Sequence, residues 1–211
     1  IVALLTNTSG TFGPSGNMVA VLQHGAAGTI STNDNVIYLT VTAGSAPAIT
    51  WDGTPTGNWD VDSTVNWKYG VTPLPFWHGD TVILDDSLTG TTNVNLTTTL
   101  LPTTVTVNNA ASNYMFTGAG KISGGATLTK QGAGLLTIAN NNDYTGSTTL
   151  SGGTVQVGTG GTAGSLGSGA VIDNGTLTYY RSDNGFVVGN AFSGAMILPW
   201  VAVTSARELT R

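Results

Sequence analysis

Residues 126–158 read ATLTKQGAGLLTIANNNDYTGSTTLSGGTVQVG. Apolar and small polar residues alternate in short runs at 127–129, 135–138 and 154–157, and clusters of Gly or Asn separate these runs. Alternation with a period of two predicts β-strands, and Gly-Gly and Asn clusters are typical of tight turns. Each run is only three to five residues long. Short strands joined by Gly and Asn corners indicate a parallel β-helix, in which each turn stacks on the one before.

The same pattern continues on both sides of this stretch. Alternating runs at 36–42, 81–84, 103–107 and 176–179 predict further strands, whereas every window with helical spacing contains Gly, Pro or clustered β-branched residues. A β-sandwich would contain similar strands, but close-set hairpin turns are lacking here. The sequence therefore predicts an all-β protein, a right-handed parallel β-helix or solenoid preceded by a small Trp-rich β module.

Alternation also predicts which side chains face the core, because every second residue of a strand lies on the same face. We expect a continuous β-stack from about residue 103 to residue 190. Its inward-facing side chains are predicted to be Leu128, Leu136, Ile138, Leu150, Val155, Val157 and Leu177.

Composition divides the chain into three regions. Residues 1–46 form a β segment that ends in a small-residue linker. Residues 47–90 hold four of the five Trp residues and form the Trp-rich β module. Residues 91–211 are rich in Gly and Thr and form the β-solenoid repeat region.

Charged residues are scarce. Lys and Arg number 6 and Asp and Glu 11 in 211 residues, which gives a net charge of −5. A nucleic-acid-binding face needs clustered cations, so nucleic acid is excluded as a partner. The absence of Cys excludes disulfides and thiolate sites. The uncharged stretch at residues 186–203 is interrupted by polar residues and Pro, so we expect no membrane insertion of this chain.

The sequence offers little for catalysis or metal binding. Acid–base catalysis needs two carboxylates in different environments, but Glu208 is the one Glu and most Asp residues lie in turn motifs. His24 and His78 have no second ligand at a chelating spacing. The loop with Asp60 and Asp62 lacks the continuation of a known calcium motif. We therefore predict no catalytic, cofactor-binding or metal-binding residue, no cofactor, and no enzymatic activity.

The Trp residues are the sharpest local feature. Trp51, Trp59, Trp67 and Trp77 lie close together in the sequence. Exposed indoles stack on sugar rings, so these four residues are candidates for a glycan-binding face. The competing interpretation is that they fill the core of a small module, because each Trp buries a large apolar surface.

The N-terminal residues are candidates for self-assembly. Ile1, Val2, Leu4 and Leu5 form an apolar run with no polar cap. The open end of a solenoid invites another strand, and head-to-tail strand addition that does not close produces a fibre. The sequence therefore predicts that the chain associates with itself.

Residues 126–158 closely resemble the autotransporter-associated β-strand repeat, also called the passenger-associated transport repeat. The matching positions are Leu128, Thr129, Lys130, Gly132, Gly134, Leu136, Ile138, Tyr144, Thr145, Gly146, Thr148, Thr149, Gly153, Thr154, Val155 and Val157. The W-D-G to D-D segment at 51–86 and the G-T-L to R-S-D segment at 175–183 are similar to the flanks of such repeats, and residues 1–42 loosely resemble the end of a preceding unit. The chain departs from the pattern after Gly194.

The resemblance implies a secreted, β-helical and mainly structural region of a bacterial surface protein, with no catalytic residues of its own. The leading hypothesis is an extracellular β-solenoid subunit that self-associates into a filament, a surface layer or an adhesin stalk. The second is a carbohydrate-binding or adhesion module that uses the Trp-rich segment to bind a surface polysaccharide. The third is a solenoid enzyme that degrades polysaccharides.

Overall fold

The computed structural model describes residues 2–6, 27–33, 36–42, 48–184 and 186–195. Every regular element in these ranges is a β-strand, so the all-β prediction is confirmed. The described part of the chain contains no helix long and apolar enough to cross a membrane. The chain divides into two compact units, residues 1–47 and residues 48–211.

The first unit is a three-stranded antiparallel sheet. Its strands are β1 (Val2–Thr6), β2 (Ala27–Asn33) and β3 (Val36–Thr42), in the order β1-β3-β2. β3 coincides with the alternating run predicted at 36–42. β1 and β2 are the two edge strands, and both pair with β3.

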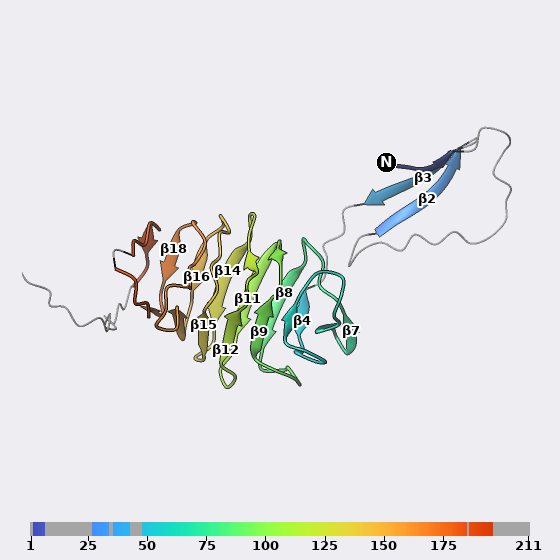
Figure 1. Ribbon diagram of the computed structural model, residues 1–211. Coiled ribbons are helices and arrows are strands. Elements are labelled where there is room, and N and C mark those ends of the chain that lie inside the picture. The colour runs from blue at the N-terminus through green and yellow to red at the C-terminus, as the bar shows by residue number, and fades with distance from the viewer. Residues whose placement is uncertain (1, 7–26, 34–35, 43–47, 185, 196–211) are drawn as a thin grey trace, which may run out of the picture. The chain divides into compact units, whose positions relative to one another are not determined.

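The second unit contains a nine-stranded sheet, a six-stranded sheet and a two-stranded sheet (Figure 1). The nine-stranded sheet contains β20 (Phe192–Ser193), β18 (Val171–Asp173), β16 (Thr148–Leu150), β14 (Thr127–Gln131), β11 (Thr104–Asn108), β8 (Thr81–Asp85), β4 (Ile49–Trp51), β6 (Trp67–Tyr69) and β7 (Thr72–Leu74), in this order. The six-stranded sheet contains β19 (Thr176–Tyr179), β17 (Thr154–Val157), β15 (Leu135–Ile138), β12 (Tyr114–Thr117), β9 (Asn93–Leu96) and β5 (Asn58–Trp59). The two-stranded sheet contains β10 (Thr99–Leu100) and β13 (Lys121–Ile122).

Parallel pairing in strict register makes this unit a β-solenoid. The chain visits the nine-stranded sheet and then the six-stranded sheet once per turn, and it repeats this for about 5 turns. Thr81 pairs with Thr104 and Thr104 with Thr127, so one turn here takes 23 residues. The predicted parallel solenoid is confirmed, and the β-sandwich alternative is wrong because a sandwich is built from antiparallel pairs. Residues 48–90 contribute β4 to β8 to the same two large sheets as the later turns.

The core is a set of columns of buried side chains, one residue per turn. Burial alternates along the strands, as the period of two requires. One column runs through Val94, Phe116, Ile138 and Val157, and all four are buried. The seven residues predicted to face inward are all buried. Neighbouring turns lie about 4.8 Å apart, so each core side chain packs on those directly above and below it.

One edge of the nine-stranded sheet ends in an antiparallel hairpin. β6 pairs with β4 and β7 pairs with β6, both antiparallel, and Gly70 with a φ of 59° forms the turn. The edge strand β7 contains Pro73. Proline has no N–H to donate, so this edge is a poor template for an added strand.

Candidate functional site

The Trp-rich segment forms a packed aromatic core. Trp51 and Trp59 are fully buried and Trp67 is 1% exposed. The ring centroids of Trp51 and Trp67 lie 5.0 Å apart, and those of Trp59 and Trp67 lie 4.9 Å apart, both edge to face. Such pairs are favourable because the positive edge of one ring meets the negative face of the other.

This burial corrects the glycan-stacking hypothesis for Trp51, Trp59 and Trp67, because a buried ring has no exposed face to stack on a sugar. The interpretation that these residues fill a core is the right one. The indole N–H of Trp51 donates a 2.8 Å hydrogen bond to the carbonyl of Thr91, which fixes the loop of the following turn. Trp77 is partly exposed, and its backbone N–H donates a 2.8 Å hydrogen bond to the carboxylate of Asp80.

The candidate self-assembly residues fall on β1, except that Ile1 lies outside the described residues. Val2 pairs with Leu39 and Leu5 pairs with Ile37, so one edge of the strand that contains Val2, Leu4 and Leu5 is already bonded to β3. No described strand pairs with the other edge of β1.

The residues considered for metal binding form hydrogen bonds with other protein groups. Asp60 accepts two hydrogen bonds from Thr64. The backbone N–H of Thr64 donates at 2.9 Å, and the hydroxyl of Thr64 donates at 3.0 Å. His78 accepts a 3.1 Å hydrogen bond from the N–H of Leu101 through Nδ1. No group of three His, Cys, Asp or Glu residues within the described ranges could hold a metal ion. His24 and Glu208 lie outside those ranges.

Several carboxylates hold loops together. Asp86 is a clear case, because it accepts hydrogen bonds from the backbone N–H groups of Ala110, Ala111 and Ser112 in the next turn. The bond from Ala110 contributes most to lowering the pKa of Asp86 to about 2. The carboxylate of Asp52 likewise accepts hydrogen bonds from the side chains of Thr54, Thr89 and Lys68. Neither carboxylate is poised to exchange a proton near neutral pH.

Lys130 occupies an inward position that the sequence analysis did not assign. It lies in register between Val107 and Leu150, and it is fully buried. Its ammonium leaves the core at the corner after β14 and donates to the carbonyls of Gln131 at 2.6 Å and Gly132 at 2.9 Å. Burial lowers the pKa of Lys130, and the negative charge of Asp86 partly opposes this. Lys130 therefore ties a corner rather than serving as a free base.

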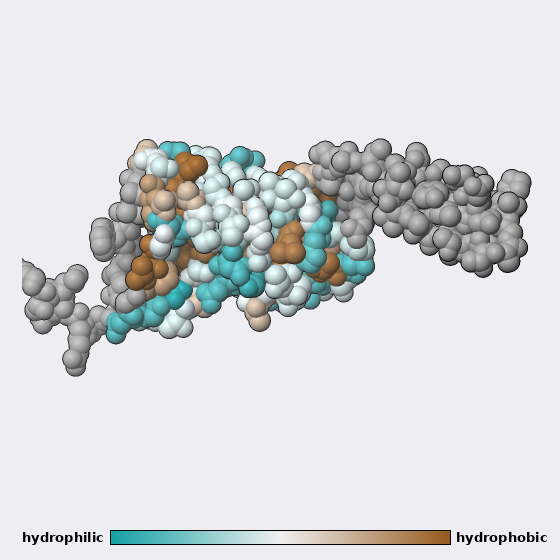
Figure 2. Space-filling model, turned by 90° about the horizontal axis from the view of Figure 1, so that it is seen from above, coloured by the Kyte–Doolittle hydropathy of each residue, from teal (hydrophilic) through white to brown (hydrophobic). Residues whose placement is uncertain are grey.

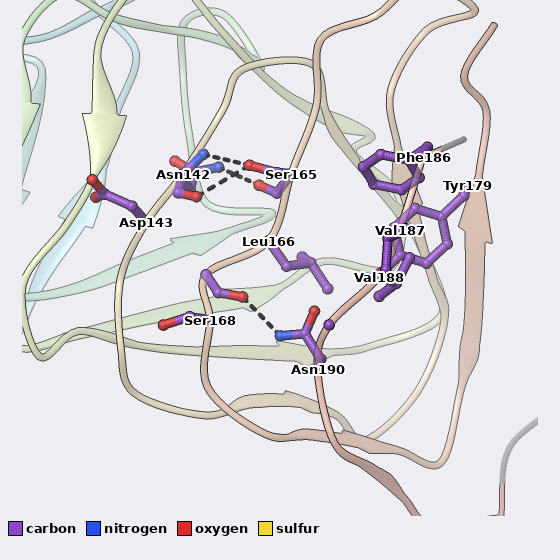
Figure 3. Close-up of a pocket in the computed structure, with 12 residues that line it drawn as sticks. Asn142, Asp143, Ser165, Leu166, Ser168, Tyr179, Phe186, Val187, Val188 and Asn190 are labelled. Atoms are coloured by element: carbon purple, nitrogen blue, oxygen red, sulfur yellow. Dashed lines mark hydrogen bonds between the residues drawn. The ribbon is translucent and has the colours of Figure 1, made fainter. Parts of the chain in front are cut away.

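A hollow lies near the last described turns (Figure 3). It has a volume of about 320 Å³ and lies between the 142–143 corner, the 165–168 loop, Tyr179 and the 186–190 segment. Asn190 closes one side by donating to the carbonyls of Gly167 at 2.8 Å and Gly169 at 2.7 Å. The sequence analysis missed this pocket, because its walls come from corners rather than from alternating strands.

The titratable groups in the described lining of the pocket are one carboxylate and one phenol. Its one carboxylate, Asp143, is paired with Lys121, which helps to lower the pKa of Asp143. Burial raises the pKa of the Tyr179 phenol, so this phenol stays protonated at neutral pH. Phe186 contacts both Tyr179 and the guanidinium of Arg181, the latter at 4.0 Å from the ring centre. The pocket is thus a neutral hollow without a pair of catalytic carboxylates.

The hydropathy of the surface varies along the second unit. Figure 2 shows one face of the second unit, where weakly polar residues (white) cover much of the middle and apolar residues (brown) form patches toward both ends. Exposed apolar side chains toward the C-terminal end include Ile172, Tyr180, Phe186 and Val187.

Comparisons with known proteins support the resemblance seen in the sequence. Residues 128–157 match the family model of the passenger-associated-transport-repeat, which covers β14 to β17. The chain is 40% identical over 72 residues to the adhesin BmaC autotransporter of Brucella suis biovar 1, a match that covers 34% of this chain and 2% of that protein. No solved structure matches the chain.

Proposed function

We propose that this chain, which carries a passenger-associated transport repeat at residues 128–157, is a structural β-solenoid segment of an extracellular bacterial passenger or adhesin protein. The observation that carries the proposal is that the residues of the repeat motif pack in the core or form hydrogen bonds at the corners. Leu128, Leu136 and Val155 fill the core, and Lys130 ties a corner. The motif residues thus build a stack, and a stack of turns is a rigid spacer that extends by repetition.

The likeness to an autotransporter adhesin supports placement at the bacterial surface or in the medium. An antibody against this chain tests the placement in the bacterium that encodes it. We expect labelling of intact cells, and loss of the label when intact cells are treated with protease. Labelling that requires permeabilised cells would refute the proposal.

Self-association is a second candidate function. No described strand pairs with the outer edges of β19 and β20 in the second unit or with the outer edge of β1 in the first. Unpaired edges accept strands, so β1 of one copy is a candidate to extend β19 or β20 of another. Sedimentation velocity of the full chain and of a chain lacking residues 2–6 tests this. We expect concentration-dependent oligomers that the deletion abolishes, and a monomeric full chain at high concentration would exclude this candidate.

The enzyme hypothesis has weaker support than either structural role. Among the described residues, Asp52, Asp86 and Asp143 are each engaged in hydrogen bonds or ion pairs. A reducing-end assay with polysaccharides and calcium is expected to show no release of sugar. Measurable release would reverse this conclusion.

A further inference from the structure

The outer face of the nine-stranded sheet carries two columns of threonine. Strand register aligns Thr81, Thr104 and Thr127 in the first column. It aligns Thr106, Thr129 and Thr149 in the second. Each residue alternates with a buried neighbour and is itself only partly covered, so its side chain points outward. The columns are an ordered array of side chains on the surface.

Within the described ranges, these six hydroxyl groups have no hydrogen-bond partner. None of them forms a hydrogen bond with any side chain or backbone group of the described residues. Other threonines behave differently: Thr103 donates to the carbonyl of Gly79 at 2.6 Å, and Thr148 bonds the Tyr144 hydroxyl at 2.7 Å. The fold therefore leaves the hydroxyls of the two columns free to bond with water or a ligand.

A third column extends the polar array. Asn108 and Gln131 pair in register at the ends of β11 and β14, and both are exposed. Primary amides both donate and accept hydrogen bonds, as hydroxyls do. The array spanning Thr104 to Thr149 on β11, β14 and β16 contains no outward-facing charged residue.

The spacing of the array suits a regular polymer. Aligned residues on neighbouring turns lie about 4.8 Å apart, and alternate residues along one strand lie about 6.7 Å apart. The distance between turns is close to the length of one pyranose unit in an extended chain. Each threonine offers a hydroxyl to bond a sugar hydroxyl and a methyl group to contact the apolar face of the ring.

The chemistry of the face disfavours other polymers. A nucleic acid or a sulfated glycan needs clustered cations, which the array lacks. An extended peptide adds to the edge of a sheet rather than to its face.

We propose that the outer face of the nine-stranded sheet between β11 and β16 binds an extended neutral polysaccharide that lies along the stacking direction, about one sugar residue per turn. This activity goes beyond the structural role proposed above, and it does not use the Trp residues.

The test compares two pairs of Thr→Val substitutions. Valine keeps the β-branched shape and the strand propensity of threonine and replaces its hydroxyl with a methyl group. The test variant is Thr106→Val with Thr129→Val. The matched control is Thr154→Val with Thr176→Val, which are also register neighbours and partly covered, but on the six-stranded sheet.

The full chain and both variants are measured by retention on insoluble cellulose, curdlan and chitin and by affinity electrophoresis in soluble starch and xylan. We expect the full chain to be retained by at least one of these, the test variant to bind it at least about tenfold more weakly, and the control to bind like the parent. Equal denaturation midpoints would show that all three proteins are folded.

Four results would overturn the proposal. The parent could bind none of the five polysaccharides, the test variant could bind as tightly as the parent, or the control could lose as much affinity as the test variant. Inhibition of ice recrystallisation by the parent without retention on any polysaccharide would also overturn it, since it would assign the hydroxyl array to an ice surface.

Discussion

Leu136 offers a direct test of the inward column on β15. Its side chain is fully buried, and it stacks in register between Tyr114 and Val155. Leu135, its neighbour on the same strand, is partly exposed on the opposite face. The substitutions Leu136→Asp and Leu135→Asp therefore place the same charge one residue apart, inside the core and outside it.

The expected magnitudes differ because of this geometry. Truncation of a buried Leu to Ala costs about 2–5 kcal/mol through lost packing and the cavity left behind. Leu136→Asp adds a buried carboxylate with no partner, so we expect a loss of about 5 kcal/mol or more, at the exceptional end for a single substitution. Leu135→Asp keeps the carboxylate in contact with water, so we expect a loss of about 1 kcal/mol or less.

Urea denaturation followed by circular dichroism measures both variants against the parent. We expect the transition of Leu136→Asp to move to much lower urea or to disappear, and the transition of Leu135→Asp to stay near that of the parent. Equal midpoints for Leu136→Asp and the parent would show that the inward column is wrong. A larger effect from Leu135→Asp would show that the register is shifted by one residue.

Three further predictions concern the corners of the solenoid. Gly153→Ala should cost about 1–3 kcal/mol by urea denaturation, because Gly153 has a φ of 67° and an added Cβ would collide with the carbonyl oxygens of the turn below; Gly161→Ala, with open space around it, should change little. Lys130→Ala should cost about 2–4 kcal/mol, because it leaves a cavity and two unbonded carbonyls, whereas Lys121→Ala, at a half-exposed ion pair, should cost about 1 kcal/mol or less in the same assay. The lowered pKa of Asp86 means that the unfolded chain binds more protons than the folded one between pH 3.8 and about 2. Stability should therefore fall as the pH falls through this window, with a shallower fall for Asp86→Ala, and identical acid titrations of the unfolding midpoint would contradict this.

Much of the solenoid could be predicted because its strands are short and most of them alternate, as in β8, β11 and β14. The run at 127–129 lies in β14, and that at 154–157 coincides with β17. A period of two directly encodes which side chains are buried, so the seven predicted core residues could be assigned without knowledge of the turns. The corners carry Gly and Asn in a pattern close to the known repeat. This pattern made the parallel stacking of one turn on the next predictable as well.

Other features could not be predicted because they depend on contacts between turns. The sequence does not distinguish a buried indole from an exposed one, and the burial of Trp59 depends on Trp67, Phe76 and Phe116 around it. The antiparallel hairpin of β6 and β7 departs from the parallel pattern of the later turns. The pocket is walled by residues from three different turns, so it has no local signal.

The contacts of Lys130 give a physical reason for the spacing K-x-G-x-G and for the Gly-Gly pair that follows it. The side chain of an inward Lys must be long enough for its ammonium to reach hydrogen-bond acceptors outside the core. In Lys130 the ammonium donates to the corner carbonyls of Gln131 and Gly132. The route passes directly below Gly153 of the next turn, where a Cβ would lie 2.7 Å from Nζ. A larger residue at 153 would therefore obstruct the ammonium of the turn below. Lysine in one turn and glycine in the next thus form the two sides of one contact, and these positions of the repeat signature describe how neighbouring turns stack.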